Sequence, residues 1–204
     1  MLFDVTCGRL AGIFGEHRLA TLPPGAFPPA AVDSEGARLL QTVGAPTGTL
    51  HLRGPDGETG RPTRVRDVVD TVALELEEVL PGTGEWPVVG WLLNTHVALD
   101  PGTGKVYAFD ADEGLVRELH TDVSSLIQVT VRFQRLLDEF TFDGDEESEF
   151  ERLEGEVELV RRETARIDPL PFRDDESPWS VVGDEIAAGQ RFTADSPGGR
   201  TLYG

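Results

Sequence analysis

The residues best suited to chemistry are one cysteine and four histidines, and they are widely scattered. Cys7 is the only cysteine, and the histidines stand at positions 17, 51, 96 and 120. No two histidines have the i,i+4 spacing of a helical metal site, and none lies at ligand spacing from the cysteine. Each histidine is therefore predicted to be a surface or half-buried residue. No catalytic residue, metal site or cofactor is predicted.

Carboxylates are abundant and occur in runs, at 75–78, 110–113, 143–158 and 174–176. Glu75, Glu77 and Glu78 would perform acid–base chemistry only if burial shifted their pKa values. A solvated face is the usual arrangement for such residues in so acidic a chain. A hydrolase that uses buried carboxylates remains a separate hypothesis, which a search for a strongly raised carboxyl pKa would test.

Gly102-Thr103-Gly104-Lys105 partly matches a phosphate-binding loop. The full pattern needs a glycine at position 99 and a serine or threonine after the lysine, where this chain has Leu99 and Val106. The segment also follows a strand pattern and leads into another strand. A hairpin turn is therefore predicted over 100–104.

Asp143, Asp145 and Glu147 match positions 1, 3 and 5 of a calcium-binding loop. The glycine required at position 6 is Ser148, and a helical pattern runs through the second half of the segment. Acidic residues also stabilise the N-terminus of a helix. The segment is therefore predicted to be the capped start of a helix.

Four residues are the candidate contacts with a partner: Asp110, Asp112 and Glu113 in one predicted hairpin turn, and Trp91 in a strand earlier in the meander. The alternative for the three carboxylates is an ordinary solvated turn. Trp91 would anchor a binding cleft if it were exposed, whereas a tryptophan in an apolar strand is more typical of the core.

The elements that would position these residues form an antiparallel meander followed by long helices. Strands are predicted over 86–93, 95–99, 105–110 and 115–119, with a further strand at 49–53. Helices are predicted over 35–43, 64–80, 123–140 and 149–167, with another that opens at 177. This order predicts an α+β fold in which helices flank an antiparallel-rich sheet. Residues 1–190 form a single predicted domain, and 191–204 a flexible C-terminal tail.

The charge of the chain limits its partners. The 204 residues include 37 acidic and 18 basic side chains, which gives a net charge of -19. Direct nucleic-acid binding needs clustered lysine and arginine, and Lys105 is the only lysine. The surface would suit a basic protein partner, although solubility alone also explains such acidity. With no secretory signal, no membrane span and no possible disulfide, a cytoplasmic location is expected.

The order of several short landmarks resembles a known family. Val43-Gly44-Ala45-Pro46 is followed by Val89-Gly90-Trp91, Val97-Ala98-Leu99-Asp100 and Thr103-Gly104-Lys105-Val106-Tyr107, and then by a helix that Asp122 would cap. Over residues 12–190 this order is similar to that of the SUKH superfamily (Smi1/Knr4-like fold), in particular its fourth immunity subgroup. The segment 54–85 does not map onto the family pattern.

The resemblance implies an immunity protein that binds and neutralises a cognate polymorphic toxin, such as a nuclease or a nucleic-acid deaminase, by blocking its active site. The expected partner is a basic toxin domain, and the protein is not expected to be an enzyme. A general regulatory or scaffold module with the same fold and no toxin partner is the alternative. The sequence leaves the oligomeric state open.

Overall fold

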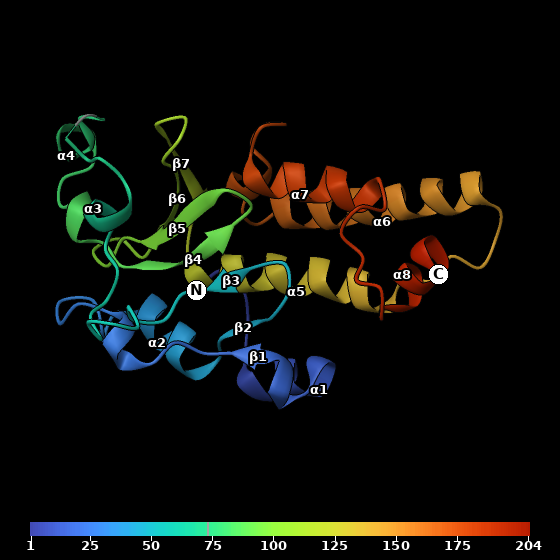
Figure 1. The fold of residues 1–204 in the computed structure, drawn as a ribbon, viewed down its shortest axis with the longest axis horizontal. Coiled ribbons are helices and arrows are strands. Elements are labelled where there is room, and N and C mark those ends of the chain that lie inside the picture. The colour runs from blue at the N-terminus through green and yellow to red at the C-terminus, as the bar shows by residue number, and fades with distance from the viewer. Residues whose placement is uncertain (73) are drawn as a thin grey trace.

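The computed structural model describes residues 1–72 and 74–204 and contains a five-stranded antiparallel sheet in the half of the molecule opposite α8 (Figure 1). The strands occur in the spatial order in which they follow one another in the chain: β3 (His51–Leu52), β4 (Val88–Leu92), β5 (Thr95–Leu99), β6 (Val106–Asp110) and β7 (Leu115–His120). The α+β class and the predicted meander are therefore confirmed. The predicted turn at 100–104 is confirmed as well, because Asp100 Oδ1 accepts a hydrogen bond from the Gly102 N–H and Gly104 has a φ of 79°.

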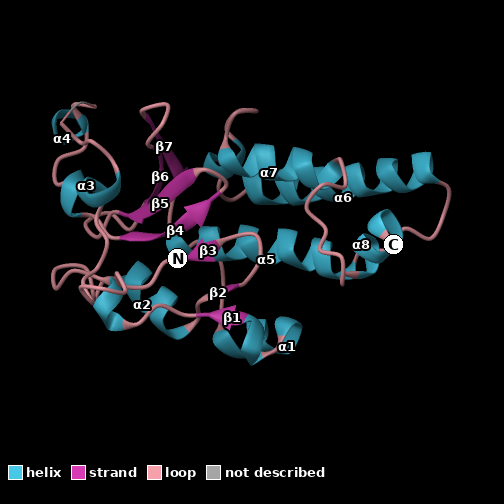
Figure 2. Ribbon diagram, viewed as in Figure 1, coloured by secondary structure: helices cyan, strands magenta, loops and turns pink. Residues whose placement is uncertain are grey.

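One face of the sheet packs against helices and builds the main core. Val97, Leu99 and Ala108 from this face join residues of α5 (Val123–Glu139) and α2 (Glu35–Thr42) in one apolar cluster. Figure 2 shows the long helix α5 running beside the sheet and continuing well past it. The Asp122 carboxylate accepts a hydrogen bond from the Ser125 N–H at 2.9 Å and so caps α5 as predicted.

The other face of the sheet is covered by residues 64–72 and 74–85, here called the flap. The flap contains α3 (Val65–Val68), α4 (Leu76–Val79) and the 3₁₀ turn η3 (Thr83–Glu85). It closes a second, separate apolar group, here called the outer cluster, which consists of Val65, Val69, Leu76, Trp86, Val88, Ala98, Tyr107 and Phe109.

The single helix predicted over 64–80 is wrong. The chain forms two helices of four residues each, and Val69 between them is extended, with a φ of -134°. Several valines in this segment have low helix propensity. Packing on the sheet satisfies the apolar pattern without a continuous helix, because Val65, Val69 and Leu76 all reach the outer cluster.

The C-terminal half adds helices along α5. They are α6 (Glu146–Ala165), α7 (Pro178–Ala187) and α8 (Pro197–Tyr203), with the short turn η4 (Leu170–Phe172) between α6 and α7. Asp145 caps α6 through the Ser148 N–H at 3.1 Å, as expected for a capped helix start. Because of this cap, α6 begins three residues earlier than predicted.

Residues 191–204 differ from the predicted loose tail. They contain α8, which lies beside the end of α5 (Figure 1). Phe192 is buried, and its ring centre lies 5.6 Å from that of Phe142. The Tyr203 hydroxyl donates a hydrogen bond to the Gly189 carbonyl at 2.8 Å.

The N-terminal part supports α2 and α5. It comprises α1 (Cys7–Phe14), the 3₁₀ turns η1 (Glu16–Arg18) and η2 (Pro24–Ala26), and the two-stranded ladder of β1 (Leu19–Ala20) and β2 (Ala45–Pro46). Gly44, just after the end of α2, has a positive φ of 70°, which favours glycine. Among the helices of the described residues, none is both long and apolar enough to cross a bilayer.

Candidate functional site

The turn between β6 and β7 carries three carboxylates: one forms hydrogen bonds within the turn, and two are exposed to solvent. Asp110 Oδ1 accepts hydrogen bonds from the N–H groups of Asp112 (2.9 Å) and Glu113 (3.0 Å), so its side chain closes the turn. Asp112 and Glu113 are exposed, and neither forms an ion pair with the described residues. Of the three predicted contact carboxylates, Asp112 and Glu113 are therefore open to solvent, and Asp110 closes the turn that carries them.

Two other acidic segments lie next to this turn. On one side, Leu74 of the flap approaches Gly114 so closely that a Cβ on Gly114 would lie 2.7 Å from Leu74 Cδ2. On the other side, a cleft of about 430 Å³ separates the turn from the loop before α7, and Asp110, Glu113 and Glu176 contribute to its walls. Three of the four acidic runs in the sequence therefore share one end of the molecule.

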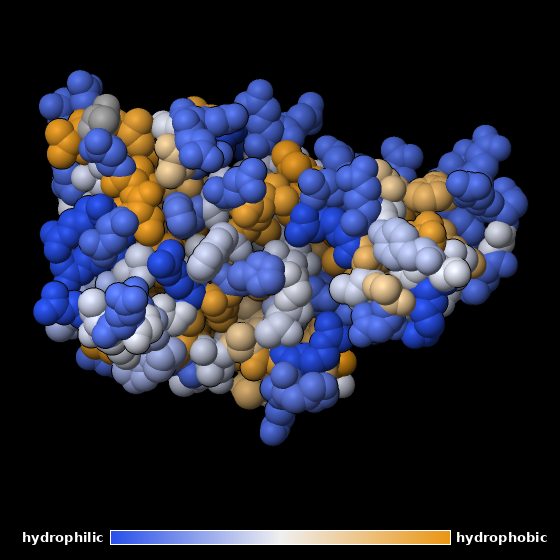
Figure 3. Space-filling model, viewed as in Figure 1, coloured by the Kyte–Doolittle hydropathy of each residue, from blue (hydrophilic) through white to orange (hydrophobic). Residues whose placement is uncertain are grey.

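We call this surface the acidic end and define it as residues 70–80 of the flap (apart from residue 73), the turn 110–114 and the loop 173–177. The three segments lie along the upper edge in Figure 1, and hydrophilic side chains predominate along that edge in Figure 3. The fourth acidic run, 143–158, lies elsewhere, at the start of α6.

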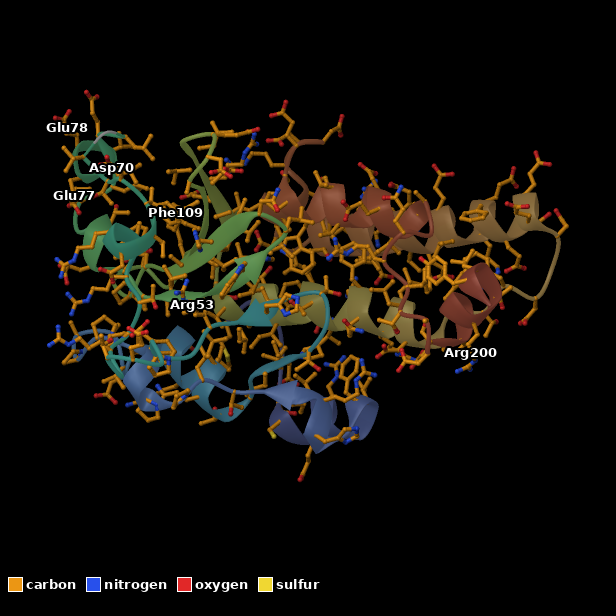
Figure 4. The ribbon with its side chains drawn as sticks, in the orientation of Figure 1. Arg53, Asp70, Glu77, Glu78, Phe109 and Arg200 are labelled. Carbon is orange, nitrogen blue, oxygen red and sulfur yellow. The ribbon has the colours of Figure 1, made fainter. Side chains whose placement is uncertain are left out.

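Arginine neutralises only part of the acidic end. Arg117 donates to Asp174 at 2.9 Å and to Glu176 at 2.8 Å and so ties β7 to the loop before α7. Glu77 accepts hydrogen bonds from the N–H groups of Gly82 and Gly84, which lower the pKa of its carboxyl group. Glu78 lies at the outer corner of the flap, where Figure 4 labels it. The exposed carboxylates therefore stand on a framework that is fixed by internal hydrogen bonds.

Trp91 is exposed, so its expected place in the core is wrong. About 37% of its surface is accessible, and the Arg53 guanidinium lies 5.0 Å from the centre of its ring. The flap covers Val88 and Ala98 on the same face of the sheet but does not reach Trp91. A bulge between Val88 and Gly90 also breaks the simple alternation of β4. Trp91 is therefore open to solvent, and its role as a binding anchor stays a prediction.

His120 is fully buried, contrary to the prediction for the histidines. The Trp179 Nε1–H donates to His120 Nε2 at 2.7 Å, and His120 Nδ1 lies 2.9 Å from Ser125 Oγ. Burial lowers the pKa of His120 to about 3, although Asp168 and Asp122 act in the opposite direction. The ring is therefore neutral at physiological pH, and its single proton lies on Nδ1.

The orientation of His120 matters because Ser125, His120 and Asp168 are the residue types of a hydrolase triad. In a triad the histidine accepts the proton of the serine hydroxyl. Here Nδ1–H donates to Ser125, and Nε2 is occupied by Trp179. Asp168 accepts hydrogen bonds from the N–H and hydroxyl of Thr121. The group fastens β7 to α5 and α7, and Trp179 is fully buried in the first turn of α7.

The other side chains considered for catalysis or metal binding lie apart from the His120 network. Cys7 is exposed on α1, and the carboxylates of Glu75 and Glu78 are exposed on the flap. In the described part of the chain, no three histidine, cysteine or acidic side chains are grouped so that they could hold a metal ion. The described surface carries the acidic end and an exposed tryptophan, whose ring lies next to the Arg53 guanidinium.

Comparison with known proteins identifies the family. The family model described as SUKH-4 immunity protein matches residues 5–185. The chain belongs to the SUKH-4 immunity protein family. No curated protein and no solved structure matches the chain. The resemblance inferred from the landmark order is therefore confirmed, and the SUKH-4 match includes the flap, which that order did not explain.

The SUKH-4 landmarks have structural roles. A Cβ on Gly90 would lie 2.4 Å from the His51 carbonyl oxygen of the neighbouring strand, so only glycine fits there. Asp122 provides the cap for α5. The grouping of Glu78, Asp112 and Asp175 was not predicted from the sequence, since they are far apart in the chain and come together only through the flap and the start of α7.

Proposed function

We propose that this SUKH-4 protein binds a cognate toxin through the acidic end and blocks the active site of that toxin. Membership of an immunity protein family carries the proposal. The position of the exposed carboxylates supports it, because Asp112 and Glu113 lie in the turn that Leu74 of the flap contacts at Gly114, and Glu78 is exposed on the same flap. Protection by this route needs binding alone and no catalysis.

The surface best fits a toxin with a basic active site. Enzymes that act on nucleic acid hold phosphate groups mainly with arginine and lysine. An acidic inhibitor would compete for the same side chains, and complementary charge also speeds association. A nuclease or a nucleic-acid deaminase is therefore the proposed class of toxin. A cytoplasmic location belongs to the same proposal, because such toxins meet their substrates there.

Growth protection tests the proposal. The probe is the toxin domain encoded next to this gene, expressed in cells with and without the protein. The proposal expects the wild-type protein to restore growth and to form a stable complex with the toxin. A protein that neither protects nor binds this toxin, but captures several host proteins, would instead support the general scaffold alternative.

A pair of charge variants tests the surface. The first replaces three carboxylates of the acidic end (E78Q, D112N and E113Q), and the second replaces three exposed carboxylates of α6 (E151Q, E154Q and E156Q). Both change the net charge by the same amount. We expect the first to weaken protection and the second to preserve it. Equal effects would mean that overall charge, and not the acidic end, governs binding.

A further inference from the structure

Two valines at the tip of the flap are almost fully exposed. Val72 has 84% of its surface accessible and Val79 has 75%, compared with 37% for Trp91 and 42% for Leu115. Single exposed apolar residues are common on protein surfaces and need no explanation. These two differ because both lie in the flap within the acidic end, Val72 before α4 and Val79 at the last residue of α4.

The flap directs these valines outward and its leucines inward. The Glu75 N–H donates to the Val72 carbonyl at 3.1 Å, so these residues are one turn apart, and Val79 follows Glu75 by four positions. Leu76 is buried in the outer cluster, and Leu74 and Leu80 pack against that cluster. Because the leucines attach the flap to the sheet, the exposed valines contribute little to folding.

The tip is held in place before any partner arrives. The Glu77 carboxylate accepts hydrogen bonds from the Gly82 N–H at 2.8 Å and the Gly84 N–H at 2.7 Å, which closes the loop after α4. The Leu80 N–H donates to the Leu76 carbonyl at 2.7 Å. A preorganised segment loses little conformational entropy on binding, so more of the contact energy appears as affinity.

Acidic side chains flank the two valines. Glu75 and Glu78 are exposed and lie between Val72 and Val79 in the sequence. Figure 3 shows hydrophobic side chains beside strongly hydrophilic ones at the corner that α4 occupies. An apolar centre with a charged rim is the usual make-up of a binding surface whose centre excludes water.

We propose that Val72 and Val79 are the apolar anchors of the complex and enter a hydrophobic pocket with a basic rim on the toxin. This inference rests on the proposed function and assigns different kinetic roles to the carboxylates and the valines. The carboxylates of the acidic end govern how fast the partners meet, whereas the valines govern how long they stay together. Charge complementarity with Glu75 and Glu78 defines the rim of the pocket.

The test compares two double variants in a surface-binding assay with the toxin domain encoded next to this gene. V72T/V79T keeps the shape of the tip and removes its apolar character. I13T/I167T is the control, since Ile13 and Ile167 are also exposed (37% and 50%) but lie outside the flap. We expect the flap variant to dissociate at least about tenfold faster, with little change in association rate, and the control to match the wild type.

The outcomes separate this inference from the proposed function. If the wild type does not bind the toxin, both fail. If the wild type binds and V72T/V79T dissociates at the wild-type rate, only the valine anchors are excluded. A V79R variant provides a second test. Its positive charge would meet the basic rim of the pocket, so it should weaken binding to the toxin more than V72T/V79T does. Unchanged thermal unfolding of each variant would show that the fold is retained.

Discussion

At the scale of single residues, burial decides what a titratable side chain does. His120 and Asp168 are inaccessible, and each is held by hydrogen bonds from neighbouring elements. Asp112 and Glu113 lie in a turn where water and a partner can reach them. The sequence alone does not separate these cases, because a histidine or carboxylate has the same chemistry until the fold sets its surroundings.

The buried histidine makes stability depend on pH. The pKa of His120 is about 3 in the folded protein and near 6.5 when unfolded, so in mild acid only the unfolded state takes up the proton. Its contribution to stability is fully present above pH 6.5 and is lost as the pH falls toward 3. The free energy of unfolding should decrease by up to about 1.4 kcal/mol per pH unit over this range.

Denaturant unfolding between pH 7 and pH 5 measures this effect. An H120Q variant should be less stable at pH 7 but should show a shallower dependence on pH. H17Q is the matched control, because His17 is exposed, and it should follow the wild-type curve. Parallel curves for H120Q and the wild type would assign the acid sensitivity to other groups.

At the scale of elements, glycine positions show how closely the parts pack. Gly90 lies in β4 against the backbone of β3, whereas Gly155 lies on α6 at a position where an added Cβ would meet nothing within 4 Å. G90A should therefore force the strands apart and destabilise the protein by about 1–3 kcal/mol. G155A should stabilise it by about 1 kcal/mol through helix propensity. Thermal unfolding of the two variants, with opposite signs, checks both expectations.

Elements with strong local signals could be predicted from the sequence, and those set by distant contacts could not. The β5–β6 turn, the cap at Asp122 and the strands each carry their own signal in neighbouring residues. The flap does not, because its apolar period fits a helix but is satisfied by packing on the sheet. α8 was missed because a glycine-rich segment has low helix propensity, and the burial of Phe192 that anchors this region is invisible in sequence.

The candidate site shows the same division. The turn at 110–113 was identified from residue types alone, but its union with the flap and with residues 174–176 depends on long-range topology. For Trp91 the sequence left two alternatives, a binding anchor and the core position that is typical of a tryptophan in an apolar strand. The exposure of Trp91 depends on how far the flap extends over the sheet, and the sequence alone does not show this.

At the scale of the whole molecule, the acidic side chains that give the net charge of -19 are concentrated in a few segments. Charges concentrated on one end produce a field that attracts a basic partner from a distance and orients it. Under the proposed function, the acidic end would give the molecule a preferred face for encounter with a basic partner.

Steering of this kind depends on ionic strength. Association with the basic toxin domain should slow roughly tenfold or more between low and high salt, because salt screens charges on the scale of the approach distance. Dissociation should change much less. Stopped-flow mixing over a range of salt concentrations measures both rates, and a salt-independent association rate would contradict electrostatic steering by the acidic end.

The sheet buries two separate apolar clusters, one on each face, and this has a consequence for evolution. The outward residues of the flap belong neither to the main core nor to the group of inward leucines that hold the flap down. Mutations at the tip can therefore accumulate without loss of the fold. Under the proposed role of the tip, a lineage facing a changing toxin would renew its contacts there, while the scaffold beneath remains under ordinary selection for stability.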